Sequence, residues 1–284
     1  MAIYSIIPFL NEFHFLDLKI EEEIKFVDKF IIIESNQRYN GKHKELLLKN
    51  NPKYQSDRFE IICLENKFTE YDESDDPQEK SDKAWANEEI QRNSAMRDFD
   101  DKDIILYSDC DEIFRRQDIP EIFNKTLEIE KRYNFSRICQ LQYVTKINLL
   151  FNADEYWYGP SCITGRTLKE LVVFYSKEKR KAKLDFNLLR RFGYGEKIVF
   201  GKNFNYVMSP EKISYKLQSF SHTELDRPEI TDLNEILKKI NSKKDVIRRR
   251  DVNGFPISLE KVPIDESYPI GILENMEFWK QFVA

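Results

Sequence analysis

A short apolar run that ends abruptly in acidic residues sets the first limit on how this chain can fold. Residues 104–107 read Ile-Ile-Leu-Tyr, and residues 108–112 read Ser-Asp-Cys-Asp-Glu. A run this short and rich in β-branched residues predicts a buried central strand rather than a helix. In an open α/β sheet, ligands bind beyond the carboxyl ends of such strands, so we expect the three carboxylates at the mouth of a crevice.

Carboxylates gathered in a crevice are costly unless a cation neutralises them. Their hard oxygen atoms favour Mg²⁺ or Mn²⁺ over Zn²⁺, and Asp109 and Asp111 are the predicted ligands, with Asp111 the better one because it lies farther from the strand. A metal held by one or two carboxylates completes its shell with water and substrate phosphates. The pattern therefore predicts a metal–diphosphate site. The alternative is an acidic surface turn, because an isolated Asp-x-Asp is common.

Strand-like and helix-like segments alternate in the first half of the chain. Strands are expected over residues 3–9, 27–33, 59–64 and 104–107, and helices over residues 13–26 and 84–99. This alternation predicts βαβ units, and hence an α/β fold with a mostly parallel sheet flanked by helices.

The second half of the chain has a less regular pattern. Strands are expected over residues 138–151, 171–175 and 198–208, and helices from Pro210, from Thr231 and over residues 272–282. The 284 residues contain no internal repeat and no Gly/Ser-rich linker, so we expect a single domain.

Composition excludes some classes of protein. Lys and Arg number 45 against 50 Asp and Glu, and a formal net charge of -5 argues against binding nucleic acid through bulk charge. The four cysteines form no Cys-x-x-Cys pair and read as the reduced thiols of an intracellular protein. The first residues lack the basic region of a signal peptide and are too short for a membrane span, so we expect a cytoplasmic protein without an integral membrane segment.

Polar side chains are also expected where the first two strands end. Since the carboxyl ends of parallel strands share one edge of a sheet, these side chains and residues 109–112 outline a nucleotide pocket. Glu34 can accept hydrogen bonds from a base or ribose, and Asp109 from a ribose hydroxyl. Arg92 can pair with diphosphate oxygens, although an ion pair with Glu88 four residues earlier fits equally well. The predicted donor-binding residues are Asn11, Glu12, Glu34, Asn36, Arg92 and Asp109.

The chain resembles glycosyltransferase family 17 over nearly its whole length, in a series of ordered motifs. In chain order these are Phe9-Leu10-Asn11-Glu12, Val27-Asp28-Lys29-Phe30, Glu34-Ser35-Asn36 with Gly41, Asp109-Cys110-Asp111-Glu112-Ile113, Trp157 with Gly159, Ser209-Pro210-Glu211-Lys212-Ile213-Ser214-Tyr215-Lys216-Leu217, and Asp232-Leu233-Asn234.

This resemblance implies a GT-A-like (Rossmann-like) enzyme. Residues 1–115 would form its nucleotide-sugar-binding half, and residues 116–284 its acceptor-side half with the C-terminal helices. The implied reaction moves N-acetylglucosamine or a related sugar, with inversion, from UDP-GlcNAc to a hydroxyl of a glycan acceptor, with Mn²⁺ or Mg²⁺ as cofactor.

The resemblance leaves the catalytic base open among three carboxylates, Asp154, Glu155 and Glu224. A base is needed to remove the proton of the acceptor hydroxyl. Trp157 and Tyr158 are expected to stack on an acceptor sugar, with packing of their loop on the sheet as the alternative.

One departure from the family concerns the metal. Where the family carries Gly-Trp-His before the Ser-Pro-Glu helix, this chain has Gly201, Lys202 and Asn203. If the family histidine is a metal ligand, Asn203 is a poorer one, and His222 is the predicted substitute. Two alternatives therefore stay open: a non-catalytic nucleotide- or glycan-binding relative, and a sugar nucleotidyltransferase. The second is disfavoured because no Gly-rich phosphate loop follows the first strand.

Overall fold

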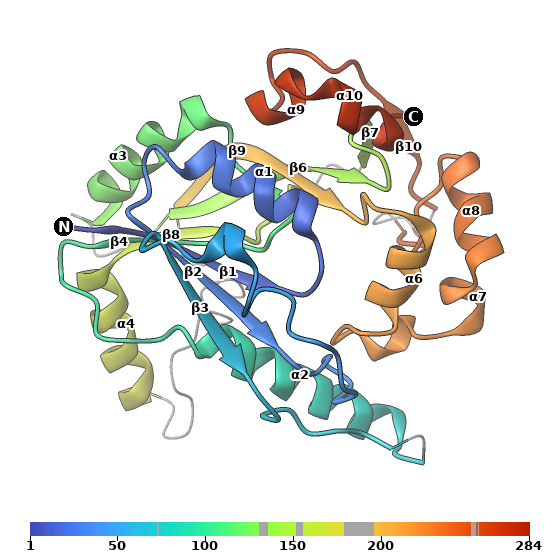
Figure 1. Ribbon diagram of the computed structural model, residues 1–284, viewed down its shortest axis with the longest axis horizontal. Coiled ribbons are helices and arrows are strands. Elements are labelled where there is room, and N and C mark those ends of the chain that lie inside the picture. The colour runs from blue at the N-terminus through green and yellow to red at the C-terminus, as the bar shows by residue number, and fades with distance from the viewer. Residues whose placement is uncertain (73, 131–135, 152–155, 179–195, 251–253, 255) are drawn as a thin grey trace.

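A single ten-stranded sheet runs through the computed structural model, which describes residues 1–72, 74–130, 136–151, 156–178, 196–250, 254 and 256–284 (Figure 1). The order along the sheet is β10-β7-β6-β8-β4-β1-β2-β3, and β9 pairs with both β6 and β5. The strands are β1 (Ile3–Phe9), β2 (Lys29–Ser35), β3 (Phe59–Leu64), β4 (Ile104–Tyr107), β5 (Glu112–Ile113), β6 (Ser136–Val144), β7 (Leu149–Phe151), β8 (Ser161–Thr164), β9 (Glu196–Asn205) and β10 (Leu259–Lys261).

The first half of the chain supplies the parallel part of this sheet. Strands β3, β2, β1 and β4 are all parallel, with Ile7 opposite Ile32 and Ile6 opposite Tyr107. Beyond β4 the pairing is mixed, because β8 is antiparallel to both β4 and β6 while β9 is parallel to β6. The predicted α/β class is confirmed, and the β4–β8 pairing joins the two halves of the chain in one sheet.

Helices cover both faces of the sheet (Figure 1). They are α1 (Phe13–Glu23), α2 (Pro77–Asn93), α3 (Ile119–Glu130), α4 (Gly165–Glu178), α6 (Pro210–Leu217), α7 (Pro228–Thr231), α8 (Leu233–Asn241), α9 (Ile270–Glu274) and α10 (Met276–Trp279). Short 3₁₀ helices span Pro52–Tyr54, Arg116–Asp118, Thr223–Leu225 and Lys280–Phe282.

Alternation along the central strands divides the core between these faces. Ile7 points to a cluster that contains Phe15 of α1 and Trp279 of α10. Its neighbour Ile6 points to a second cluster, with Phe99 after α2 and Leu168 of α4. Successive side chains of a strand alternate between faces, so a strand that is apolar throughout must be covered on both.

Local signals account for where α2 and α6 begin. The Asp76 carboxylate accepts hydrogen bonds from the first turn of α2, and Ser209 Oγ accepts one from the Lys212 N–H in α6. Pro77 and Pro210 take the first helical positions, where the missing N–H costs nothing. The helix start predicted at Ser209-Pro210-Glu211 is therefore confirmed.

Two predicted strands are corrected. Residues 171–175 lie within α4, because Leu168, Leu171 and Val172 recur at helical spacing and pack on the sheet. The strand expected over residues 138–151 is instead two antiparallel strands, β6 and β7. Between them, Thr145 has a φ of 64°, so the chain turns there. Within the described residues, no helix has the length and apolar character needed to cross a membrane.

Candidate functional site

The carboxyl ends of β1 and β4 bring two acidic segments together at one edge of the sheet. The two strands are parallel neighbours, so the turn that follows Tyr107 lies beside residues 11–12 at the start of α1. In that turn the Glu112 N–H donates to the Asp109 carbonyl oxygen at 3.1 Å. Residues about 100 positions apart in the sequence thus form one acidic cluster at this edge of the sheet, which we call the mouth of the candidate site.

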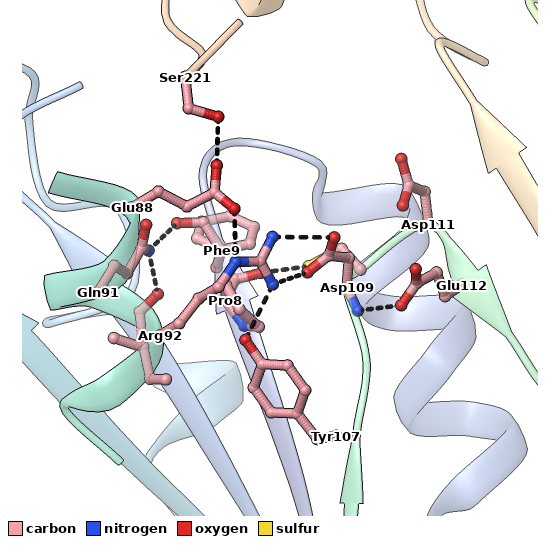
Figure 2. Close-up of polar contacts among 12 residues, drawn as sticks. Pro8, Phe9, Glu88, Gln91, Arg92, Tyr107, Asp109, Asp111, Glu112 and Ser221 are labelled. Carbon is pink, nitrogen blue, oxygen red and sulfur yellow. Dashed lines mark hydrogen bonds and ion pairs between the residues drawn. The ribbon is translucent and has the colours of Figure 1, made fainter. Parts of the chain in front are cut away.

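Arg92 of α2 holds the Asp109 carboxylate with both ends of its guanidinium (Figure 2). The two nitrogen–oxygen distances are 2.7 and 3.2 Å, and Arg92 also donates to Glu88 at 2.8 Å and to the Tyr107 hydroxyl at 2.9 Å. Burial disfavours the guanidinium charge, but Asp109, Tyr107 and Glu88 outweigh it and raise the pKa of Arg92 well above its usual value. Arg92 therefore makes the ion pair with Glu88 and a bidentate pair with Asp109 at once.

Glu88 extends this network to a segment far along the chain. Its other carboxylate oxygen accepts a hydrogen bond from the Ser221 hydroxyl (Figure 2). Ser221 follows α6, so the network ties the C-terminal half of the chain to Asp109.

Glu112 belongs to the acidic turn but is not among the predicted donor-binding or metal-binding residues. Its side chain is fully buried and accepts hydrogen bonds from the Asp109 N–H at 2.6 Å and from the Trp157 indole N–H at 2.5 Å. Trp157 also forms a backbone bridge with Gln140 of β6. Glu112 thus joins the acidic turn to the segment that contains Trp157. The sequence signal for it was its place in the acidic run, but its indole partner is 45 residues away.

Asp111 lies beyond Asp109, away from Arg92, and has a different cation as its partner (Figure 2). Lys216 in the last turn of α6 places its Nζ 3.0 Å from Asp111 and 3.1 Å from Glu12. Burial disfavours the ammonium, but Asp111 and Glu12 outweigh it and raise the pKa of Lys216 well above its usual value. Burial likewise opposes ionisation of Glu12, yet Lys216 and the Asn11 N–H lower the pKa of Glu12.

The electrostatic balance of the mouth is negative. Burial raises the pKa of Asp111 to about 6, and the charges of Asp109, Glu12 and Glu112 act in the same direction against the attraction of Lys216. Carboxylates therefore outnumber Arg92 and Lys216, the cations that pair with them in the contacts above. A site of this kind favours a further cation or a retained proton.

Two residues beside the acidic segments each carry a buried amide oxygen. Asn11 Oδ1 and Asn203 Oδ1 are buried without a hydrogen-bond partner among the described residues. Asn11 precedes Glu12, and Asn203 lies opposite Glu112 in the β5–β9 pair. Carboxylate and amide oxygens are the donors that Mg²⁺ and Mn²⁺ prefer, so the chemistry of this set fits such an ion. Asp, Glu, His and Cys side chains alone do not form such a site, because no three of them in the described ranges make a metal-binding group.

His222 and Glu224 pair with each other on the exposed segment that follows Ser221. His222 Nδ1 is 2.8 Å from the Glu224 carboxylate, and the imidazole ring contacts Trp85 of α2 and Phe220. The structure does not bring His222 together with Asp109 and Asp111 as a metal-binding group. Asp154 and Glu155, the other two predicted bases, fall outside the described residues.

Glu34 and Asn36 stand at the end of β2, where they were expected, but their side chains already have partners. The buried Glu34 carboxylate accepts from Lys44 Nζ at 2.8 Å and from two backbone N–H groups at 2.8 and 2.9 Å. Asn36 exchanges hydrogen bonds with Asn66.

Tyr158, predicted to bind the acceptor, also has partners. Two cations lie over its ring, Arg137 at 5.2 Å and Lys197 at 4.6 Å from the ring centroid. Donor or acceptor contacts by these residues stay predictions.

Comparisons with known proteins bear on the half of the chain that carries the acidic turn. Residues 2–132 match the model of glycosyltransferase family 17. No curated protein matches the chain.

Three solved structures resemble the chain at low identity. A Francisella tularensis 2-C-methyl-D-erythritol 4-phosphate cytidylyltransferase is 13% identical with a TM-score of 0.42, over 76% of this chain and 98% of its own. A 4-diphosphocytidyl-2C-methyl-D-erythritol synthase is 9% identical with a TM-score of 0.38, over 71% and 90%. A mannose-6-phosphate isomerase from Helicobacter pylori is 9% identical with a TM-score of 0.34, over 62% and 76%. Likenesses this distant carry no argument about activity or ligands.

Proposed function

We propose that this chain, whose residues 2–132 match glycosyltransferase family 17, is an inverting, metal-dependent enzyme that uses a UDP-sugar. The match to this family supports glycosyltransferase activity. The sugar proposed is N-acetylglucosamine or a close relative, and the acceptor is a hydroxyl group of a glycan. The observation that supports the proposal is the convergence of Glu12, Asp109 and Asp111 at the ends of β1 and β4, all within the matched residues.

The donor would lie at this mouth, beyond the carboxyl ends of the parallel strands. Asp109, which Arg92 holds in place, would accept hydrogen bonds from ribose hydroxyls. Asn11 Oδ1 needs a hydrogen-bond donor or an ion as its partner, which a bound ligand would supply. Glu34 and Asn36 would act from the neighbouring strand end, chiefly by shaping the loop after β2 through the contacts they already make.

Asp109 and Asp111 are the residues proposed to hold Mn²⁺ or Mg²⁺, with Asn203 Oδ1 as a neutral oxygen donor nearby. When bound, such an ion neutralises the negative charge that develops on the leaving diphosphate. The negative balance of the mouth supports this assignment, because an anionic diphosphate would otherwise be repelled by the surrounding carboxylates.

In the proposed reaction the acceptor oxygen bonds to the anomeric carbon while the bond from that carbon to the diphosphate oxygen breaks. UDP leaves, and a carboxylate on the opposite face takes the proton of the acceptor hydroxyl. Asp154 and Glu155 precede Trp157, which Glu112 holds beside the donor turn. The third candidate base, Glu224, pairs with His222.

A nucleotide-sugar panel tests the proposed donor. Ligand that binds only the folded protein raises its melting temperature by mass action. We expect one UDP-sugar to raise the Tm in the presence of Mn²⁺, and we expect UDP release when a suitable glycan acceptor is added. Formation of a nucleotide-sugar from UTP and a sugar 1-phosphate would instead identify a nucleotidyltransferase. Metal-dependent binding of UDP-sugar without turnover on any acceptor would favour the non-catalytic alternative.

A cytoplasmic location is part of the same proposal. All four cysteines, Cys63, Cys110, Cys139 and Cys162, are free, as is usual in a reducing compartment.

A further inference from the structure

Lys216 is the cation that α6 brings to the mouth of the site. Its ammonium lies between Glu12 and Asp111, at 3.1 and 3.0 Å, and the exposed fractions of the three side chains are 12%, 7% and 10%. Glu12 begins α1 and Asp111 follows β4, so three segments distant in sequence meet at one nitrogen atom.

The partners of Lys216 differ from those of the other buried cations. Lys19 is completely buried, donates to the Glu112 backbone carbonyl at 2.7 Å, and pairs with Glu23. Arg92 has its guanidinium fixed by two carboxylates and a tyrosine hydroxyl. Among the described residues, the Lys216 ammonium pairs with two carboxylates and lies 5.8 Å from the centroid of the Tyr206 ring, and no backbone carbonyl accepts from its Nζ.

The ion pairs of Lys216 with Glu12 and Asp111 can be replaced by contacts with another cation. A divalent cation at Asp111 would bring twice the charge of the ammonium to the same oxygen atoms, and two cations close together repel each other. Lysine carries a compact charge on a flexible four-carbon stem, so its ammonium can move while α6 stays in place. Capping by Ser209 keeps the start of that helix fixed.

We propose that Lys216 is an exchangeable counter-ion: it neutralises Glu12 and Asp111 in the free protein, is displaced by a divalent cation, and then binds the donor's diphosphate. This inference rests on the proposed function and adds a donor-binding residue to it. It predicts that Lys216 weakens metal binding in the absence of nucleotide and strengthens nucleotide binding in the presence of metal.

The test uses Lys216→Met, which keeps most of the aliphatic stem and removes the charge. Lys212→Met, one turn earlier on the same helix and exposed, is the matched control. Calorimetry with MnCl₂ alone should give at least a tenfold tighter Kd for Lys216→Met than for wild type. Calorimetry with UDP at saturating Mn²⁺ should give at least a tenfold weaker Kd, and the control should match wild type in both experiments. Unchanged affinity for Mn²⁺ in Lys216→Met would overturn the exchange.

A measurement on the wild-type chain decides the matter if Lys216→Met does not fold. Amine labelling followed by mass spectrometry reports how accessible each lysine is. Lys216 should be protected in metal-free protein, become reactive with Mn²⁺ alone, and be protected again with Mn²⁺ and UDP, while Lys212 stays constant. Lack of a response to Mn²⁺ contradicts the inference.

Failure of the inference and failure of the proposed function give different results. If UDP binds normally to folded Lys216→Met, the transferase proposal stands and the role of Lys216 falls. If Mn²⁺ exposes Lys216 but no nucleotide binds under any condition, the exchange stands and the proposed donor falls. If Mn²⁺ does not bind to wild type at all, both the metal assignment and the exchange are wrong.

Discussion

At the scale of single residues, Asp111 shows what it costs to gather carboxylates at a strand end. Burial and the neighbouring charges of Asp109 and Glu12 raise its pKa from 3.8 to about 6, although Lys216 lies 3.0 Å away. A carboxyl whose pKa is raised by folding stabilises the fold while it is protonated. That contribution is complete below pH 4 and is lost as the pH rises through about 6.

Asp111→Asn should therefore stabilise the metal-free protein at neutral pH. Asn keeps an oxygen that accepts from Lys216 but carries no charge, so we expect the free energy of unfolding at pH 7.5 to rise by about 1–3 kcal/mol. The gain over wild type should shrink toward pH 4.5. Urea denaturation at the two pH values, with a chelator present, measures it. A variant that is less stable than wild type at pH 7.5 would show that the ionised carboxylate supports the fold.

At the scale of elements, Glu112 connects β5 to the segment before β8 through the Trp157 indole. Glu112 belongs to the turn predicted to bind the donor, and Trp157 to the segment predicted to bind the acceptor. Because the Glu112 carboxylate is fully buried, each of its hydrogen bonds is expensive to lose.

Trp157→Phe tests this connection. It keeps an aromatic ring but removes the N–H that Glu112 accepts, so we expect a loss of about 1–3 kcal/mol in unfolding free energy. The exposed neighbour Tyr156, changed to Phe, should alter stability by no more than about 0.5 kcal/mol. Thermal and urea denaturation give the comparison. In a double-mutant cycle, Glu112→Gln and Trp157→Phe should be non-additive, and simple additivity would show that the two side chains act independently.

At the scale of the whole molecule, the part that matches the family model is not structurally separate from the rest. Strand β4 lies between β1 and β8, and β8 belongs to the second half of the chain. Arg92, which pairs with Asp109, comes from the first half. Two other partners of the acidic turn, Trp157 and Lys216, come from the second half, as does Ser221, which is linked to the turn through Glu88 and Arg92.

We accordingly expect residues 1–132 expressed alone not to fold cooperatively. The fragment would lose β8 beside β4, which leaves an apolar central strand as an exposed edge. It would also leave Glu12 and Asp111 without the ammonium of Lys216. Circular dichroism during urea denaturation should show a broad, non-cooperative change for the fragment and a single sharp transition for the full chain. A sharp transition for the fragment would establish an independent N-terminal domain.

The order of local elements could be predicted from sequence because its signals are local. The apolar runs of β1, β2, β3 and β4 and the Ser209-Pro210 start of α6 need no knowledge of distant residues. The acidic turn after Tyr107 was recognisable for the same reason. The apolar run at residues 171–175 was misread as a strand, since a short run fits either periodicity until the surface it packs on is known.

The partners of the acidic residues were decided by tertiary structure. Nothing near Asp111 in the sequence indicates that Lys216 lies beside it, 105 residues away, or that Trp157 donates to Glu112. Arg92 had two candidate roles, and only the fold showed that its guanidinium group contacts Glu88 and Asp109 at the same time. Sequence patterns report periodicity along one element, whereas the charge balance of a site depends on which elements the sheet brings to the same edge.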